Sequence, residues 1–155
     1  MLIEVKARVA WKIDGKTKKR IETYILFKDI FAQAEYNVMA TITDCINDGT
    51  AEDFEIIGLK QSTIKEIISQ YEGEYSYVVT LRDTITQDDG TEKQMKYKVL
   101  LWADSITEAM NHAREVASQG YDMQIDGLKE VNYTFLNSNG NGESETPENQ
   151  QPAGA

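Results

Sequence analysis

The 155-residue sequence has few of the residues that build disulfides, metal sites and many active sites. It contains one cysteine, Cys45, and one histidine, His112. A single cysteine cannot form an internal disulfide, and these two residues cannot supply the four ligands of a structural zinc site. We therefore expect a fold that depends on its hydrophobic core, without metal or other cofactor, in a reducing compartment such as the cytoplasm.

Long apolar segments are also missing. Glu4, Lys6 and Arg8 interrupt the N-terminal segment, so it has no apolar signal core, and no stretch of about twenty apolar residues follows. The sequence therefore predicts a soluble protein that has no membrane partner.

Motifs of common enzymes are absent as well. The chain has no glycine-rich phosphate loop, no Gly-x-Ser-x-Gly segment and no paired-histidine motif. We expect His112 on the polar side of a helix and Cys45 as a small buried residue. The acidic residues near 44–53 and 88–89 lack the spacing of a calcium loop. The sequence predicts no enzyme, although a pocket of convergent polar groups would not be visible in it.

What the sequence does contain is a segment that occurs twice. The octad Asp53–Lys60 returns as Asp122–Lys129, with five of its eight positions identical. Each octad is predicted to be a closing strand, in which Gly58 or Gly127 permits a bulge or close packing.

The elements before the two octads recur in the same order. Residues 5–13 alternate as a half-buried strand, Asp14-Gly15 supplies a turn, and residues 21–28 form the return strand. A helix follows, with Asp29 as its predicted N-terminal cap and Gly49 as its end. Its apolar face comprises Phe31, Ala34, Val38, Ile42 and Ile46.

The second copy follows the same plan. Asp89-Gly90 repeats the turn seventy-five positions later, and residues 95–102 repeat the return strand. Ser105 and Glu108 form a predicted capping box, and Gly120 ends the helix. The apolar face of this helix comprises Ile106, Ala109, Met110, Ala113, Val116 and Ala117. The second octad is expected to continue to Phe135 as one last strand.

Residues 62–71 are ambiguous between a helix and a strand. We favour a strand that a Glu72-Gly73 turn joins to a neighbouring strand beginning at Tyr75, because strict alternation resumes there. The predicted class is α+β: one globular domain, 1–136, made of two β-β-α-β repeats, about 3–70 and 71–136. The repeats share one mainly antiparallel sheet, or two packed sheets, with two helices on one side. Residues 137–155 contain no apolar side chain larger than alanine and are predicted to be a disordered tail.

The strongest functional signal is a basic hairpin tip. Four of the five residues from 16 to 20 are cations in a chain whose net charge is −10. Cations can follow a phosphate backbone and aromatic rings can stack on bases, as in proteins that bind single strands on a sheet. We therefore predict a nucleic-acid site on the two hairpins, made of Trp11, Lys12, Lys16, Lys18, Lys19, Arg20, Tyr24, Lys96, Tyr97 and Lys98.

The same residues have a plainer interpretation. Alternating Lys and Arg can form the solvent face of a hairpin, and Trp11 and Trp102 can belong to the core. The tail, with its three acids, loosely resembles the acidic tails of single-strand binding proteins, which recruit partners; a plain disordered end is the alternative.

Three segments resemble a known family. The junction Tyr24–Glu35, the run Thr63–Ile67 and the second hairpin are similar to small proteins of Bacteroidetes and their phages, catalogued as domain of unknown function 4494. The resemblance covers about residues 3–136. Where the family usually has a Ser-Phe-Thr-Glu-Ala-type junction, this chain has Asp29-Ile30-Phe31-Ala32-Gln33-Ala34. The resemblance supplies no catalytic motif, and it implies a phage or phage-like element in the host cytoplasm.

Two functions remain open. The first is a non-enzymatic phage accessory that binds single-stranded nucleic acid in DNA replication or recombination, with other phage or host replication proteins as partners through the tail. The alternative is a protein-interaction or structural module that forms a homo-oligomer and does not bind nucleic acid, favoured by the excess of acid and by strand edges that are free to pair.

Overall fold

The computed structural model describes residues 1–119 and 123–137, and the chain divides into two compact units. Unit 1 comprises Met1–Ser62 and the segment that begins at Tyr133, and unit 2 comprises Thr63–Asn132. The predicted repeats meet at 70/71, whereas the units meet at 62/63 and 132/133.

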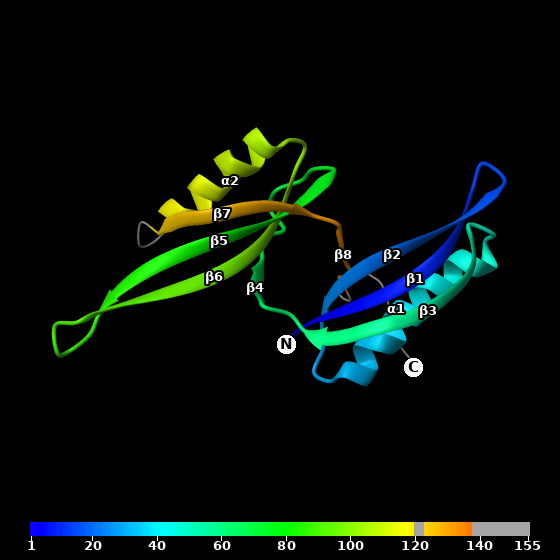
Figure 1. The fold of residues 1–155 in the computed structure, drawn as a ribbon, viewed down its shortest axis with the longest axis horizontal. Helices are drawn as coiled ribbons and strands as arrows, with labels where there is room; N and C mark the ends of the chain where they lie inside the picture. Colours follow the sequence, from blue (N-terminus) through cyan, green and yellow to red (C-terminus); the bar gives the residue numbers. More distant parts are fainter. Residues whose placement is uncertain (120–122, 138–155) are drawn as a thin grey trace. The chain divides into compact units, whose positions relative to one another are not determined.

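Unit 1 is a four-stranded sheet with one helix on one face (Figure 1). Its elements are β1 (Leu2–Ile13), β2 (Lys16–Phe27), α1 (Phe31–Asn47), β3 (Ala51–Gln61) and β8 (Tyr133–Phe135), in the sheet order β3-β1-β2-β8. Alternate residues of β1 point toward the helix, as the period of two predicts. Val5 and Val9 pack there against Ala34, Val38 and Ile42, all fully buried.

Unit 2 repeats this arrangement. Its elements are β4 (Ile64–Ile67), β5 (Tyr75–Thr86), β6 (Glu92–Ala103), α2 (Ile106–Ser118) and β7 (Gln124–Val131), in the sheet order β4-β6-β5-β7. Three alanines of α2, Ala109, Ala113 and Ala117, pack against the sheet. Two helices on mainly antiparallel sheets confirm the predicted α+β class.

The fourth strand of each sheet is supplied by the other repeat. β4 follows the first octad in the chain but pairs parallel with β6, and β8 follows the second octad but pairs parallel with β2. Ile64 and Tyr133, the first residues of these strands, lie at the same distance from the start of their octads. The two repeats therefore exchange their last strands.

Two predictions about strand pairing were wrong. Residues 64–67 do form a strand, but it neighbours β6 rather than β5. The last strand is two strands, because the chain leaves the sheet of unit 2 after Val131 and joins that of unit 1 at Tyr133. Parallel neighbours distant in sequence leave no turn signal by which the pairing could be foreseen.

Both octads contain the same β-bulge. Gly58 lies opposite Lys6 and Gly127 opposite Thr80, and the register shifts at the next residue in each case. The extra residue is Ile57 in one copy and Asp126 in the other, since each is passed over by the pairing. The predicted role of the glycines in a bulge is confirmed.

The helix ends agree with the sequence in part. Ser105 Oγ accepts a hydrogen bond from the Glu108 amide at 3.1 Å, and Glu108 Oε1 accepts one from the Asp104 amide at 2.9 Å. Gly49 follows α1 with a φ of 87°, which favours glycine. The cap predicted at Asp29 was wrong, because Ile30 occupies the N-cap position and α1 has no side-chain cap. Gly120 and the tail from residue 138 lie outside the described residues.

Gly73 gives a test of the packing in unit 2. A Cβ atom at this position would overlap the backbone of Ala103, the last residue of β6, whereas one at Gly127 would meet no atom within 4 Å. We expect Gly73→Ala to lower the free energy of unfolding by about 1–3 kcal/mol in urea titrations. Gly127→Ala is the control and should leave it unchanged or raise it by up to about 1 kcal/mol. Equal effects of the two substitutions would contradict this packing.

Candidate nucleic-acid interface

The basic tip lies on a two-stranded part of the sheet in unit 1. β1 pairs with β3 only as far as Trp11, and β8 pairs only with Thr23–Ile25 of β2. Among the described residues, segment 12–22 therefore has no third strand; it contacts the neighbouring part of the chain through a hydrogen bond from the Lys12 amide to the Thr50 carbonyl at 2.9 Å and one from the Thr17 hydroxyl to Glu52. We call this segment the basic ribbon. It is the blue hairpin end in Figure 1.

The register places cations on both faces of the basic ribbon. Lys16 and Lys18 are paired with Ile13 and Trp11, so they share a face with those residues and with Arg20, which is paired with Val9. The opposite face presents Lys12 and Lys19. All five cations are exposed, and none forms an ion pair with another described residue.

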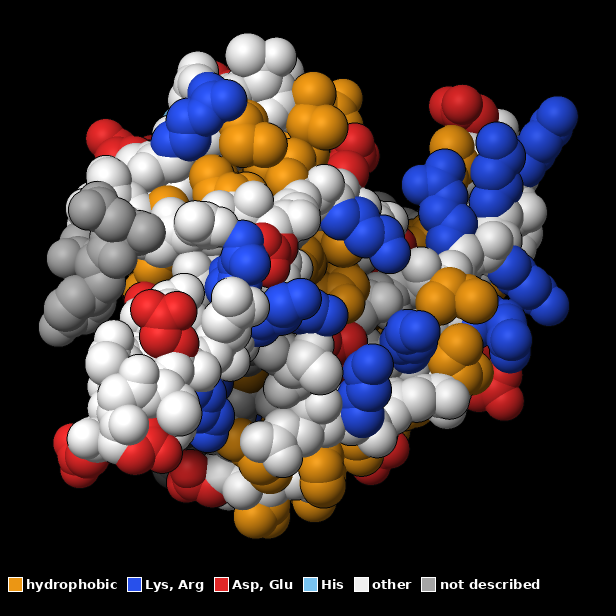
Figure 2. Space-filling view, turned by 60° about the vertical axis from the view of Figure 1, so that its left-hand side comes forward, with side chains coloured by type: hydrophobic (Ala, Val, Ile, Leu, Met, Phe, Trp, Pro, Cys, Tyr) orange, Lys and Arg blue, Asp and Glu red, His pale blue; other side chains and the backbone are white. Residues whose placement is uncertain are grey.

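Figure 2 shows a projecting part of the surface that is crowded with Lys and Arg side chains. The basic ribbon has five cations and two acids, Asp14 and Glu22. A local excess of this kind attracts polyanions even in a protein whose overall charge is negative.

Tyr24 cannot be part of a binding surface. Its side chain is 5 % exposed and belongs to the core beneath α1. Burial raises the pKa of its hydroxyl to about 12, and the nearby Glu22 and Cys45 add to the effect. Trp11 is half-buried and packs against the same core from the ribbon's base, so it alone among the predicted aromatics of this hairpin retains an accessible surface.

The predicted residues of the second hairpin do not share one face. Lys96 and Lys98 lie opposite Arg82 and Thr80, whereas Tyr97 lies opposite Leu81 on the face that carries α2. Tyr97 is half-buried and lines a cavity of about 370 Å³ together with Lys65, Glu66, Ile68, Leu81, Val99, Val116, Gln119 and Met123. It therefore cannot act beside the two lysines.

Lys96 has an acidic partner in the structure, which it shares with Arg82. Its Nζ lies 3.6 Å from Asp126 Oδ2, and Arg82 Nε lies 3.2 Å from the other oxygen of the same carboxylate. Lys98 is exposed. The cations that remain as candidates for phosphate binding are thus concentrated on the basic ribbon.

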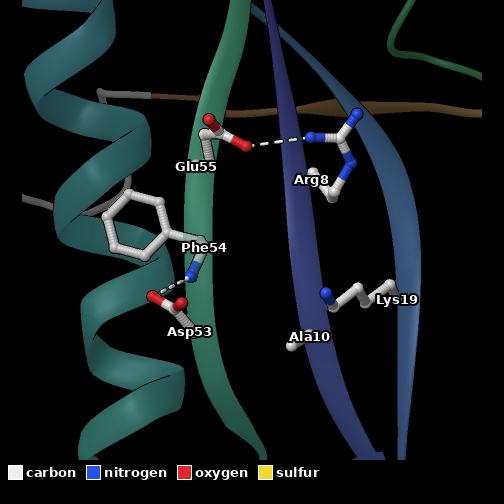
Figure 3. A pocket seen from close by; sticks show the side chains of 6 residues that line it. All are labelled: Arg8, Ala10, Lys19, Asp53, Phe54 and Glu55. Atoms are coloured by element: carbon white, nitrogen blue, oxygen red, sulfur yellow. Dashed lines mark hydrogen bonds and ion pairs between the residues drawn. The ribbon is translucent and has the colours of Figure 1, made fainter.

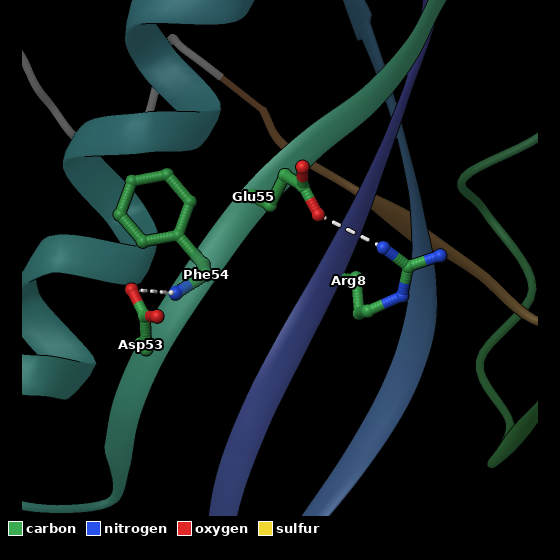
Figure 4. A network of polar contacts seen from close by, with 4 residues as sticks. All are labelled: Arg8, Asp53, Phe54 and Glu55. Atoms are coloured by element: carbon green, nitrogen blue, oxygen red, sulfur yellow. Dashed lines mark hydrogen bonds and ion pairs between the residues drawn. The ribbon is translucent and has the colours of Figure 1, made fainter.

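The sequence did not reveal an ion pair between Arg8 and Glu55, which lies near the base of the basic ribbon. Arg8 Nη1 donates a hydrogen bond to Glu55 Oε1 at 2.8 Å, across the ladder between β1 and β3 (Figure 4). Lys19 and Asp53 line a small pocket of about 90 Å³ on the same face, one on each side of Ala10 (Figure 3). Asp53 and Glu55 weaken the attraction of this pocket for an anion, so we expect weaker phosphate contacts at Lys19 than at the four ribbon cations outside its lining, Lys12, Lys16, Lys18 and Arg20.

The Arg8 pair has a counterpart in the second copy. Arg82 donates to Gln124, at the octad position equivalent to Glu55, and both pairs are direct register partners. Aligning the octads would have revealed Glu55 and Gln124 as equivalents, but only the register identifies the two arginines as their partners.

His112 is only partly exposed, because its ring is covered by a neighbouring aromatic side chain. It is half-buried, and its ring stacks on Tyr71 with centroids 4.0 Å apart and planes 9° apart. Its Nδ1 atom is buried and has no hydrogen-bond partner among the described residues. Across residues 1–119 and 123–137, no group of three or more His, Cys, Asp or Glu side chains is placed to hold a metal ion.

These features define a small α+β protein with exchanged strands and a cationic ribbon. The model of the family described as domain of unknown function (DUF4494) matches residues 2–135, so the chain belongs to that family, as the resemblance indicated. No curated protein and no solved structure matches the chain. Among the described residues, neither helix is long and apolar enough to span a membrane.

The burial of Tyr24 predicts a loss of stability at high pH. The unfolded chain releases the Tyr24 proton near pH 10, whereas the folded chain keeps it until about pH 12, so unfolding becomes more favourable as pH rises between these values. Tyr24→Phe should reduce this loss in urea titrations from pH 9 to 12, although other tyrosines with raised pKa values will keep part of it. An accessible, base-stacking Tyr24 would instead give the variant and the wild type the same pH dependence.

Proposed function

We propose that this protein is a non-enzymatic accessory that binds single-stranded nucleic acid through the basic ribbon. The observation that carries the proposal is the exposure of five cations, free of ion pairs with other described residues, on both faces of a two-stranded projection. Phosphate contacts of this kind supply most of the affinity in binding without sequence specificity.

Trp11 is the aromatic residue best placed to contact a base. It lies on the same face as Lys16, Lys18 and Arg20 and is directly paired with Lys18. A nucleotide whose phosphate contacts these cations could lay its base on the exposed part of the indole ring. Because Tyr24 is buried and Tyr97 lies in the other unit, stacking is confined to this one ring and phosphate contacts dominate.

The cellular setting belongs to the same proposal. In this proposal the protein is encoded by a phage and acts in DNA replication or recombination in the cytoplasm of a bacterial host. A cationic ribbon that binds nucleic acid and catalyses no reaction is consistent with that setting. Recruitment of other phage or host replication proteins through the tail, residues 137–155, is a further part of it.

Fluorescence anisotropy with a labelled single-stranded 30-mer tests the basic ribbon. We expect binding at low salt, and we expect the replacement of Lys16, Lys18, Lys19 and Arg20 by Ser to weaken it at least about tenfold. The slope of log affinity against log salt should fall by roughly 3, because each lost single-strand phosphate contact removes about 0.7.

A matched control removes four exposed cations from elsewhere, Lys6, Lys65, Arg114 and Lys129, and makes the same change in net charge. This variant should bind almost as well as the wild type. Equal losses in both variants, or no binding by the wild type at low salt, would reject the site.

Tryptophan fluorescence separates stacking from phosphate binding. In a Trp102→Phe background Trp11 is the only tryptophan, so its emission reports on that ring alone. We expect quenching by the single strand and much less by a duplex of the same length, because duplex bases are already stacked. Unchanged emission at saturation would show that Trp11 does not contact bases.

A further inference from the structure

The hairpin of unit 2 ends in a second two-stranded ribbon. β5 pairs with β7 only as far as Arg82, and β4 pairs with β6 only from Lys98 on. Segment 83–97 therefore has no third strand among the described residues, and it corresponds to the basic ribbon in the other copy of the repeat. We call it the acidic ribbon.

The two ribbons carry opposite charge. Residues 83–92 contain four acids, Asp83, Asp88, Asp89 and Glu92, and no cation, and of the two lysines that follow, Lys96 is paired with Asp126. Asp88, Asp89 and Glu92 are exposed. The basic ribbon has five cations against two acids. Two ribbons of like geometry have thus acquired complementary charge.

We propose that the acidic ribbon of one copy of this chain binds the basic ribbon of a second copy. Both ribbons have outer strand edges with no neighbour among the described residues, at 16–22 in β2 and 92–97 in β6, and such edges readily pair with another chain. Opposite charges select this pairing over basic-to-basic or acidic-to-acidic contacts, where like charges repel.

Such contacts join copies head to tail. Each copy has one ribbon of each kind, so the interface is heterologous and a bound pair keeps one free ribbon of each charge. The occupant is a second copy because its acidic ribbon has the same number of strands as the basic ribbon and the opposite charge. Because the contact is electrostatic and exposed, it is confined to low salt.

Sedimentation velocity of the nucleic-acid-free chain at rising concentration tests this pairing. At about 20 mM salt the average mass should increase with concentration, and at about 300 mM, where charges interact over only a few ångströms, the chain should be monomeric. A wild type that remains monomeric at low salt would overturn the inference.

Charge reversal provides the specific test. Lys16→Glu, Lys18→Glu and Lys19→Glu give a chain with two acidic ribbons; Asp83→Lys, Asp88→Lys and Glu92→Lys give one with two basic ribbons. Asp89 is kept because its carboxylate holds the turn through the amide of Thr91, at 2.9 Å. Each variant alone should be monomeric at low salt, an equimolar mixture should associate, and the chain with all six changes should associate like the wild type.

Net charge cannot mimic this pattern. The second set of changes brings the net charge from −10 to −4, which would promote unspecific association, yet we expect that variant alone to be monomeric. Association of either variant alone, or failure of the mixture to associate, would refute the pairing of ribbons. A chain with Asp83→Asn, Asp88→Asn and Glu92→Gln retains Lys16, Lys18, Lys19 and Arg20 and gains no cation, so its binding to the 30-mer tests the proposed function separately.

Discussion

The fold depends on two short parallel pairings, β4 with β6 and β8 with β2. Each completes a sheet with a strand from the other repeat, so neither β-β-α-β unit finishes its sheet with its own following segment. Glu4, which is 4 % exposed, lies in unit 1 beside the two points at which the chain leaves and re-enters that unit. Its carboxylate accepts hydrogen bonds from Ser62 at 2.6 Å, where the chain leaves that unit, and from Tyr133 at 3.3 Å, where the chain returns.

Much of the local structure could be predicted because it is encoded by neighbours in sequence. Alternation gave the long strands of both hairpins, Asp-Gly marked one turn and Ser105 with Glu108 marked a helix start, all of which involve residues a few positions apart. The glycine of each octad pointed to a bulge or to close packing, because a glycine inside a strand is typical of both; the register shows that it is a bulge. The repeat itself was visible for the same reason, since every element recurs in order.

The site was less predictable, because exposure depends on tertiary packing. Alternation places Tyr24 on the buried face of β2, but only the position of α1 shows that the ring is covered completely. Lys96, Tyr97 and Lys98 are consecutive in a strand, where neighbouring side chains point to opposite faces. Tyr97 therefore lies on the other face from the two lysines. The ion pair Arg8–Glu55 joins positions 47 residues apart, which no local pattern reveals. The cluster of cations was visible in the sequence because its members are neighbours in the chain, whereas the absence of a third strand beside it, among the described residues, is seen only in the structure.

The shared bulge also bears on how duplicated halves can diverge. A bulged residue makes no regular ladder pairing, so a substitution there leaves the neighbouring strands in register. In one half this residue is Ile57, which offers no charge, and in the other it is Asp126, which attracts both Arg82 and Lys96. A single difference at a position that the sheet tolerates therefore gives Arg82 and Lys96 a shared acidic partner that the first copy lacks at this place. The backbone of the two copies is thus alike at the bulge, while the charge beside the strands differs.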